Sequence, residues 1–202
     1  MNSRMDMNFY RQKLLNVVLY FSKNTKHANT TKICKLLYYF DFEHFVQTGY
    51  PAIGLQYYSF QRGPVPKSFW LEVKDGIVPE DFRGKLGLLV KDNESDPEKK
   101  EIEFKAIDKP DLSFFSPREK EIIERIAFIF SESTAKEISD ISHLKNKPWD
   151  ITKRTKGLNA PIDYLQAIDP SSEISVDEAK ELLGEFFETV HNFSLYPTND
   201  PQ

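Results

Sequence analysis

Cysteine is nearly absent from this 202-residue chain, and Cys34 is the only one. A single cysteine excludes an intramolecular disulfide, a cysteine-based zinc site and a CxxC redox pair. Because Cys34 lies on a half-apolar predicted helix, we interpret it as a buried structural residue rather than a nucleophile. A chain without disulfides suits a reducing compartment, so we expect the protein to be cytoplasmic.

Long hydrophobic runs are absent as well. The longest nearly apolar stretch, residues 14–21, is interrupted by Asn16 and is too short to span a bilayer. It also lacks the small-residue cleavage site of a signal peptide. We therefore expect neither export nor a membrane partner.

The sequence contains no HExxH, GxSxG, GxGxxG or GxxxxGKS/T pattern, so the usual devices of zinc hydrolysis, elbow-type hydrolysis and nucleotide binding are missing. No two of the four histidines have the spacing that would place them on one helical face as metal ligands. Asp41, Glu43 and His44 cluster on a predicted helix, but the two carboxylates point to different sides, and we interpret the group as a solvent-exposed face. These patterns predict a non-enzyme with no catalytic residue, metal or cofactor.

The composition that remains is typical of a globular domain. Hydrophobic residues make up 40 % of the chain and aromatic residues 13 %, including 16 Phe and nine Tyr, which can bury much apolar area. The length lies within the range of one domain. We predict a compact α+β domain over 1–196, predominantly α-helical with a small β-hairpin insertion, followed by a tail over 197–202.

Apolar residues recur at helical spacing in several segments, and capping residues mark where helices begin. The 29–31 segment offers caps to one helix that Gly49 ends, and Ser116 and Thr134 each open a capping box. An apolar run, a polar break and an alternating segment predict the hairpin over about 81–112. We predict helices over 9–22, 32–47, 67–74, 117–131, 134–142 and 176–191, a β segment over 56–60, a rigid loop over 63–66 and a loop-rich stretch over 146–172.

Positive charge is concentrated near the N-terminus. Residues 1–40 hold seven Lys and Arg but one acidic residue, a net +6 in a chain whose net charge is −4. Such a region could face phosphate, pack on the acidic remainder of the chain or be a solvated surface. A nucleic-acid-binding regulator is thus an alternative function. The turn between the first two helices is too long for a helix-turn-helix and the second helix too apolar, so we do not expect nucleic acid as the partner.

Three groups of residues have features of a binding surface. Lys35 and Tyr39 are neighbours four residues apart on a helix. The segment 60–65 places an arginine beside a glycine and a proline, which gives a stiff loop. An imidazole and an indole at 143 and 149 could clamp the following loop onto the domain. The predicted partner-binding residues are Lys35, Tyr39, Phe60, Arg62, Gly63, Pro64 and Val65, and the predicted structural motif is Leu36, Leu37, Tyr38, His143, Pro148 and Trp149.

The same segments carry a family resemblance over about residues 9–152. The sequence resembles the Panacea domain, also called the SocA-like antitoxin domain, whose members include phage-associated proteins. The motifs that carry it are Lys35-Leu36-Leu37-Tyr38, Gly49-Tyr50-Pro51, Phe60 with Gly63-Pro64-Val65, Ile138-Ser139, and Ser142-His143 followed by Pro148-Trp149.

The resemblance implies a non-enzymatic antitoxin of a bacterial or phage toxin–antitoxin pair. It implies that the protein neutralises a cognate toxin, encoded next door, by direct binding, and that it could act as an adaptor that presents the toxin to a cytosolic protease. A homodimer is compatible with the sequence. A hydrolase using Glu43, His44 and His143 is the least favoured alternative, and it requires the three side chains to converge in one pocket.

Overall fold

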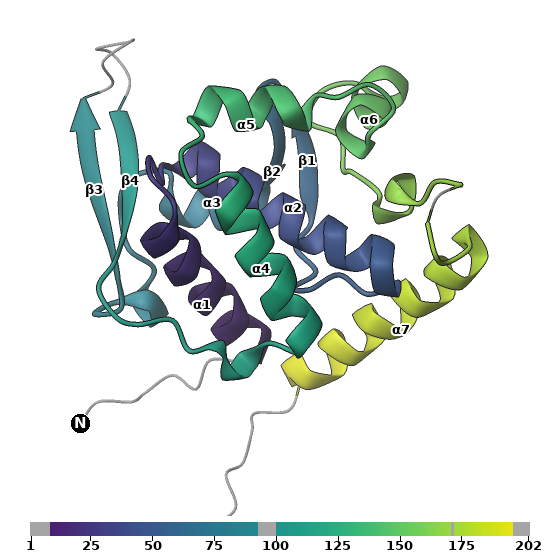
Figure 1. Cartoon of the computed structure of the whole chain (residues 1–202), viewed down its shortest axis with the longest axis horizontal. Coiled ribbons are helices and arrows are strands. Elements are labelled where there is room, and N and C mark those ends of the chain that lie inside the picture. The colour runs from purple at the N-terminus through teal and green to yellow at the C-terminus, as the bar shows by residue number, and fades with distance from the viewer. Residues whose placement is uncertain (1–8, 93–99, 171, 196–202) are drawn as a thin grey trace, which may run out of the picture.

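The computed structural model describes residues 9–92, 100–170 and 172–195 (Figure 1). Within these ranges helices dominate, and the named strands form two separate two-stranded antiparallel sheets. The predicted α+β, predominantly helical class is therefore confirmed. The elements, with 3₁₀ helices written η, are α1 (Phe9–Asn24), α2 (Thr30–Thr48), β1 (Tyr57–Phe60), β2 (Gly63–Pro66), α3 (Lys67–Val73), η1 (Glu80–Phe82), β3 (Leu86–Asp92), β4 (Lys100–Ala106), η2 (Leu112–Phe114), α4 (Pro117–Ile129), α5 (Ala135–Ser142), α6 (Pro148–Lys156), η3 (Tyr164–Ala167) and α7 (Val176–Leu195).

The central element is α2, which runs through the middle of the molecule (Figure 1). It packs against α1, α3, α4, α5, β2, β4 and η3. The side chain of Asn29 caps its start by accepting from the backbone N–H of Lys32, and Gly49 ends it in the left-handed conformation, φ +77°. Because neighbours surround α2, its buried residues are not confined to one face, and they include charged ones.

Local capping chemistry sets the starts of the later helices as predicted. Ser116 and Glu119 form a reciprocal capping box at α4, with Pro117 in the first turn. Thr134 and Glu137 repeat the arrangement at α5. At α7 the hydroxyl of Ser175 accepts from a backbone N–H in the first turn.

The predicted hairpin is present as β3 and β4, which pair from Leu86↔Ala106 to Asp92↔Lys100. It stands at one side of the molecule, next to α1 (Figure 1). Apart from Asp92, its polar break lies outside the described residues. Phe104 anchors the hairpin, because its ring is fully buried and its backbone N–H donates to the carbonyl of Ala28 over 2.8 Å.

Two of the predicted loops are wrong. The 63–66 segment is strand β2, which pairs antiparallel with β1 in the register Ser59↔Pro64. Proline is tolerated there because a two-stranded sheet leaves each strand one edge that needs no ladder donor. The loop-rich stretch contains α6 and η3. Pro148 suits the first turn of α6, and the basic residues of its last turn suit the negative end of the helix dipole.

A buried carboxylate joins α2 to the chain that follows it. Asp41 is fully buried and accepts hydrogen bonds from the backbone N–H groups of residues 53, 54 and 55 at 2.6, 3.1 and 3.2 Å. It also accepts from the hydroxyls of Tyr57 at 2.9 Å and Tyr164 at 3.2 Å. Burial raises the pKa of Asp41, and these donors oppose that shift. The expectation that Asp41 lies on a solvent-exposed face is thus wrong, whereas Glu43 is exposed.

We expect Asp41→Asn to destabilise the fold by about 3 kcal/mol. The substitution replaces one carboxylate oxygen, which accepts hydrogen bonds, with an amide N–H₂ group that would face the same N–H and O–H donors. The free energy of unfolding in urea measures the effect. Glu43→Gln, on the same helix but exposed and paired with Arg125, is the matched control and should cost less than about 1 kcal/mol. Equal losses from the two variants would contradict a central role for Asp41.

Candidate functional site

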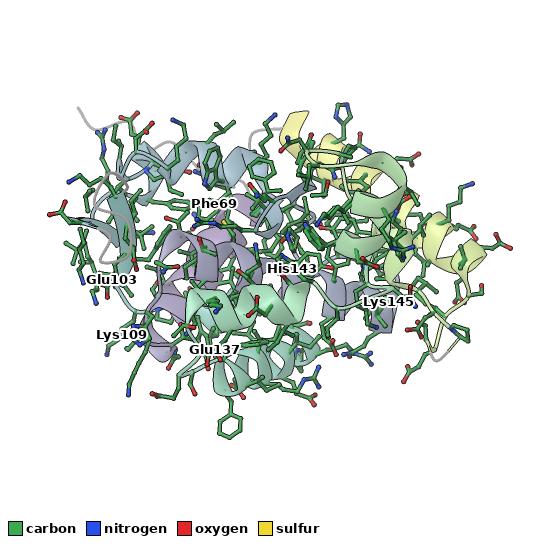
Figure 2. All side chains as sticks on the ribbon, turned by 90° about the horizontal axis from the view of Figure 1, so that it is seen from above. Phe69, Glu103, Lys109, Glu137, His143 and Lys145 are labelled. Carbon is green, nitrogen blue, oxygen red and sulfur yellow. The ribbon has the colours of Figure 1, made fainter. Side chains whose placement is uncertain are left out.

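The turn between β1 and β2 meets the end of α5 and the start of α6, which are distant from it in the sequence, beside α2. His143 lies where α5 ends (Figure 2). Their closest contacts involve residues from all three of the groups that have features of a binding surface in the sequence. We call this site the motif junction, defined as Lys35, Phe60, Gly63, Pro64, Ser142, His143 and Trp149.

Lys35 is fully buried, and its Nζ donates to the carbonyl oxygen of Pro64 over 2.8 Å. Burial lowers its pKa to about 8. The predicted exposure of Lys35 to a partner is wrong for this conformation, because β2 and α5 cover the face of α2 from which the side chain projects. Lys35 therefore ties β2 to α2.

Gly63 lies tightly packed between Lys35 and the end of α5. Its φ of +99° disfavours any side chain. A Cβ added there would stand 2.6 Å from Ser142 Oγ, 2.7 Å from Lys35 Cε and 3.0 Å from His143 Nε2. Glycine is thus required twice over at this position, by backbone conformation and by close packing.

His143 and Trp149 clamp α5, α6 and β1 together. Their rings are stacked with centroids 4.0 Å apart and an interplanar angle of 20°, and Trp149 Nε1 donates to the carbonyl of Phe60 over 2.9 Å. Burial and the nearby charge of Lys35 lower the pKa of His143. Nε2 of His143 is buried without a hydrogen-bond partner within the described residues, which also favours the uncharged ring.

The predicted partner-binding residues differ in exposure. Arg62 is exposed, and Phe60 and Tyr39 are partly exposed. The ring of Tyr39 stacks on Phe130 with centroids 5.1 Å apart, and burial raises the pKa of its hydroxyl. The remaining members, Lys35, Gly63, Pro64 and Val65, are buried, as are Leu36, Leu37, Tyr38, Pro148 and Trp149 of the predicted structural motif.

Within the described residues, most cations of the basic N-terminal region are paired or buried. Arg11 pairs with two carboxylates and Lys13 with one that is itself buried. Lys32 is fully buried and donates to the backbone carbonyls of residues 26 and 133 at 2.5 and 2.6 Å. Lys35 is buried at the motif junction, and Arg4 lies outside the described residues. These partners remove most of the charge on which the nucleic-acid hypothesis depended.

The residues of the hydrolase hypothesis lie in three separate environments. Glu43 pairs with Arg125, His44 Nδ1 lies 2.7 Å from the carbonyl of Tyr50, and His143 stacks on Trp149. Burial raises the pKa of Cys34 to about 12, so its thiol is protonated near neutral pH. In the described part of the chain no group of three His, Cys, Asp or Glu could hold a metal ion.

Sequence reasoning also missed two sites with buried charged side chains. Lys13 of α1 forms a buried ion pair with Glu119 of α4, and His44 Nε2 lies 4.0 Å from the same carboxylate. Lys32 is the second. Its apolar neighbours Ile33, Leu36 and Leu37 could have indicated its burial. A helix with so many apolar residues has little solvent-facing surface for a lysine.

A family model described as "Antitoxin SocA-like, Panacea domain" matches residues 33–150. The chain belongs to this family. The matched segment begins in α2, ends in α6 and contains every residue of the motif junction. Neither the comparison with curated proteins nor that with solved structures finds a match. Across the described residues of this Panacea protein, no helix has the length and apolar character needed to cross a membrane.

We expect Gly63→Ala to destabilise the protein by roughly 2 kcal/mol more than Gly84→Ala. Both glycines have positive φ, +99° and +78°, but a Cβ at Gly84 meets no atom within 4 Å. The control therefore carries the backbone strain alone, and the difference in unfolding free energy measures the collision at the motif junction. Indistinguishable losses would contradict the close packing around Gly63.

The lowered pKa of Lys35 predicts a pH-dependent stability. Between about 8 and 10.5 the unfolded state binds more protons at this residue than the folded state, so its contribution to the unfolding free energy rises with pH. From pH 8 to 9.5 we expect the wild type to gain up to about 1.4 kcal/mol per pH unit relative to Lys35→Met. The exposed Lys23→Met is the control, and a constant difference between wild type and Lys35→Met would contradict the lowered pKa.

Proposed function

We propose that this chain is the antitoxin of a bacterial or phage toxin–antitoxin pair and neutralises its toxin by direct protein–protein binding. The toxin is the product of the adjacent open reading frame. Neutralisation is non-enzymatic and takes place in the cytoplasm. The single, buried thiol of Cys34 suits this reducing compartment.

The family match over residues 33–150 is the observation that carries this proposal. The motif junction supports it, because its polar groups are used to hold segments together. Lys35 of α2 donates to the carbonyl of Pro64 in β2, and Trp149 of α6 donates to that of Phe60 in β1. Such an arrangement fixes a surface in advance of binding, which lowers the cost of association.

The alternatives receive less support. A nucleic-acid-binding regulator would need exposed positive charge on the first two helices, but Arg11 and Lys13 are paired there and Lys32 and Lys35 are buried. A hydrolase would need Glu43, His44 and His143 in one pocket, and each has a different partner.

Co-expression of the adjacent open reading frame with and without this chain tests the proposal. We expect growth arrest from the neighbour alone, relief when this chain is present, and co-purification of a complex with fixed stoichiometry by native mass spectrometry. A fixed stoichiometry is the mark of binding, because an enzyme would act at substoichiometric amounts.

The same experiment separates the two modes of neutralisation. Relief with a stable complex indicates that the toxin is blocked, whereas relief without a complex and with falling toxin levels indicates delivery to a protease. A neighbour that is harmless when expressed alone would contradict the antitoxin function.

A further inference from the structure

Exposed positive charge gathers around α6. The segment 143–157 has five Lys and Arg and one acidic residue, a net +4 in a chain of net −4. All five basic side chains are exposed, as is Arg62 of the β1–β2 turn. Two of the five pair with carboxylates, Lys147 with Asp169 at 3.7 Å and Arg154 with Asp150 at 3.0 Å. Lys145 follows the end of α5 in the sequence, and Figure 2 labels both it and His143. We call this surface the α6 face, defined as Arg62, Lys145, Lys147, Lys153, Arg154 and Lys156.

The α6 face is held in place by the motif junction. Lys153 Nζ lies 4.7 Å from the centroid of the Trp149 ring, and the backbone of Arg62 hydrogen-bonds to His143. At the far end of α6, Ser59 Oγ donates to the carbonyl of Gly157 over 2.8 Å. The two parts of the face, α6 and the β1–β2 turn, are therefore attached to each other on both sides.

Apolar side chains accompany these charges. Ile141, Leu144 and Leu158 flank α6 in the sequence and are 42, 55 and 46 % exposed. A surface that combines apolar groups with basic ones fits a protein partner, whose interface has an apolar centre and a charged rim. A phosphate backbone would gain nothing from the leucines, and the acidic remainder of the chain would repel a polyanion.

We propose that the α6 face is the surface on which the toxin docks, through an acidic patch on the toxin that surrounds an apolar contact. This inference rests on the proposed antitoxin function and names the part of the molecule that carries it out. The buried motif residues position the face, and the exposed basic residues contact the partner.

The test compares two triple charge reversals. One variant carries Arg62→Glu, Lys145→Glu and Lys156→Glu on the α6 face, and the control carries Lys23→Glu, Arg83→Glu and Arg118→Glu, all exposed and on other elements. Each triple changes the net charge from −4 to −10. Thermal melting of both variants, expected to match the wild type, shows that each is folded.

Binding to the purified product of the adjacent open reading frame is then measured by calorimetry at about 50 and 300 mM salt. We expect the Kd of the α6-face variant to be roughly tenfold higher than that of the wild type at low salt, and the Kd of the control to change by less than about twofold. The difference should shrink at high salt, because screening weakens charge pairs at an interface rim.

Several results would overturn the proposal. If the wild type binds the neighbour's product and the α6-face variant binds it equally well, the docking surface is wrong while the antitoxin function stands. If the wild type does not bind it, the function and the surface fail together. Unchanged toxin binding, combined with a salt-sensitive self-association or binding to a 20-bp DNA duplex that only the α6-face variant loses, would reassign the face to a second copy of this chain or to nucleic acid.

Discussion

The buried carboxylate of Asp41 is the interaction on which the rest of the structure depends. Because α2 is enclosed by neighbouring elements, a charge on it must find its partners within the protein, and removal of such partners costs several kcal/mol. Asp41 collects the N–H groups of residues 53–55 and the hydroxyls of Tyr57 and Tyr164. These bonds set the path by which the chain leaves α2 and enters β1, and they hold η3 against the same helix.

Lys35 is a second buried charge of α2 that finds its partner within the protein, here near the turn of the β1–β2 pair. Its bond to the carbonyl of Pro64 fixes β2, while the bond from Tyr57 to Asp41 fixes β1. Because both strands are held, the position of the turn at Gly63 is fixed. His143 and Trp149 then pack against this turn. The orientation of α6 therefore follows from two buried charges on α2.

The parts of the fold that local chemistry determines could be predicted from the sequence. Capping by Ser116 and Thr134 uses groups within four residues of each other, so the helix starts were correct. The fate of a charged side chain depends on which distant segments cover it, and the sequence could not show that Asp41 and Lys35 are enclosed. The prolines of β2 were misleading for a related reason, since they are tolerated because β2 pairs with β1 alone in the part of the chain that the structure describes. The motifs at 60–65 and 143–149 were found in the sequence, but the contact between them arises only in the folded chain.

Buried contacts order α6, whereas the basic side chains around it are exposed. α6 has only nine residues, fewer than an isolated helix needs to be stable, so its order comes from Trp149, from the bond between Thr152 and Gln166, and from the contacts of Ser59. The residues that carry the family resemblance are therefore mostly scaffold. The side chains of Arg62, Lys145 and Lys156 are exposed on that scaffold, so substitutions there can alter the surface charge while the buried bonds of α2 keep the surface in shape.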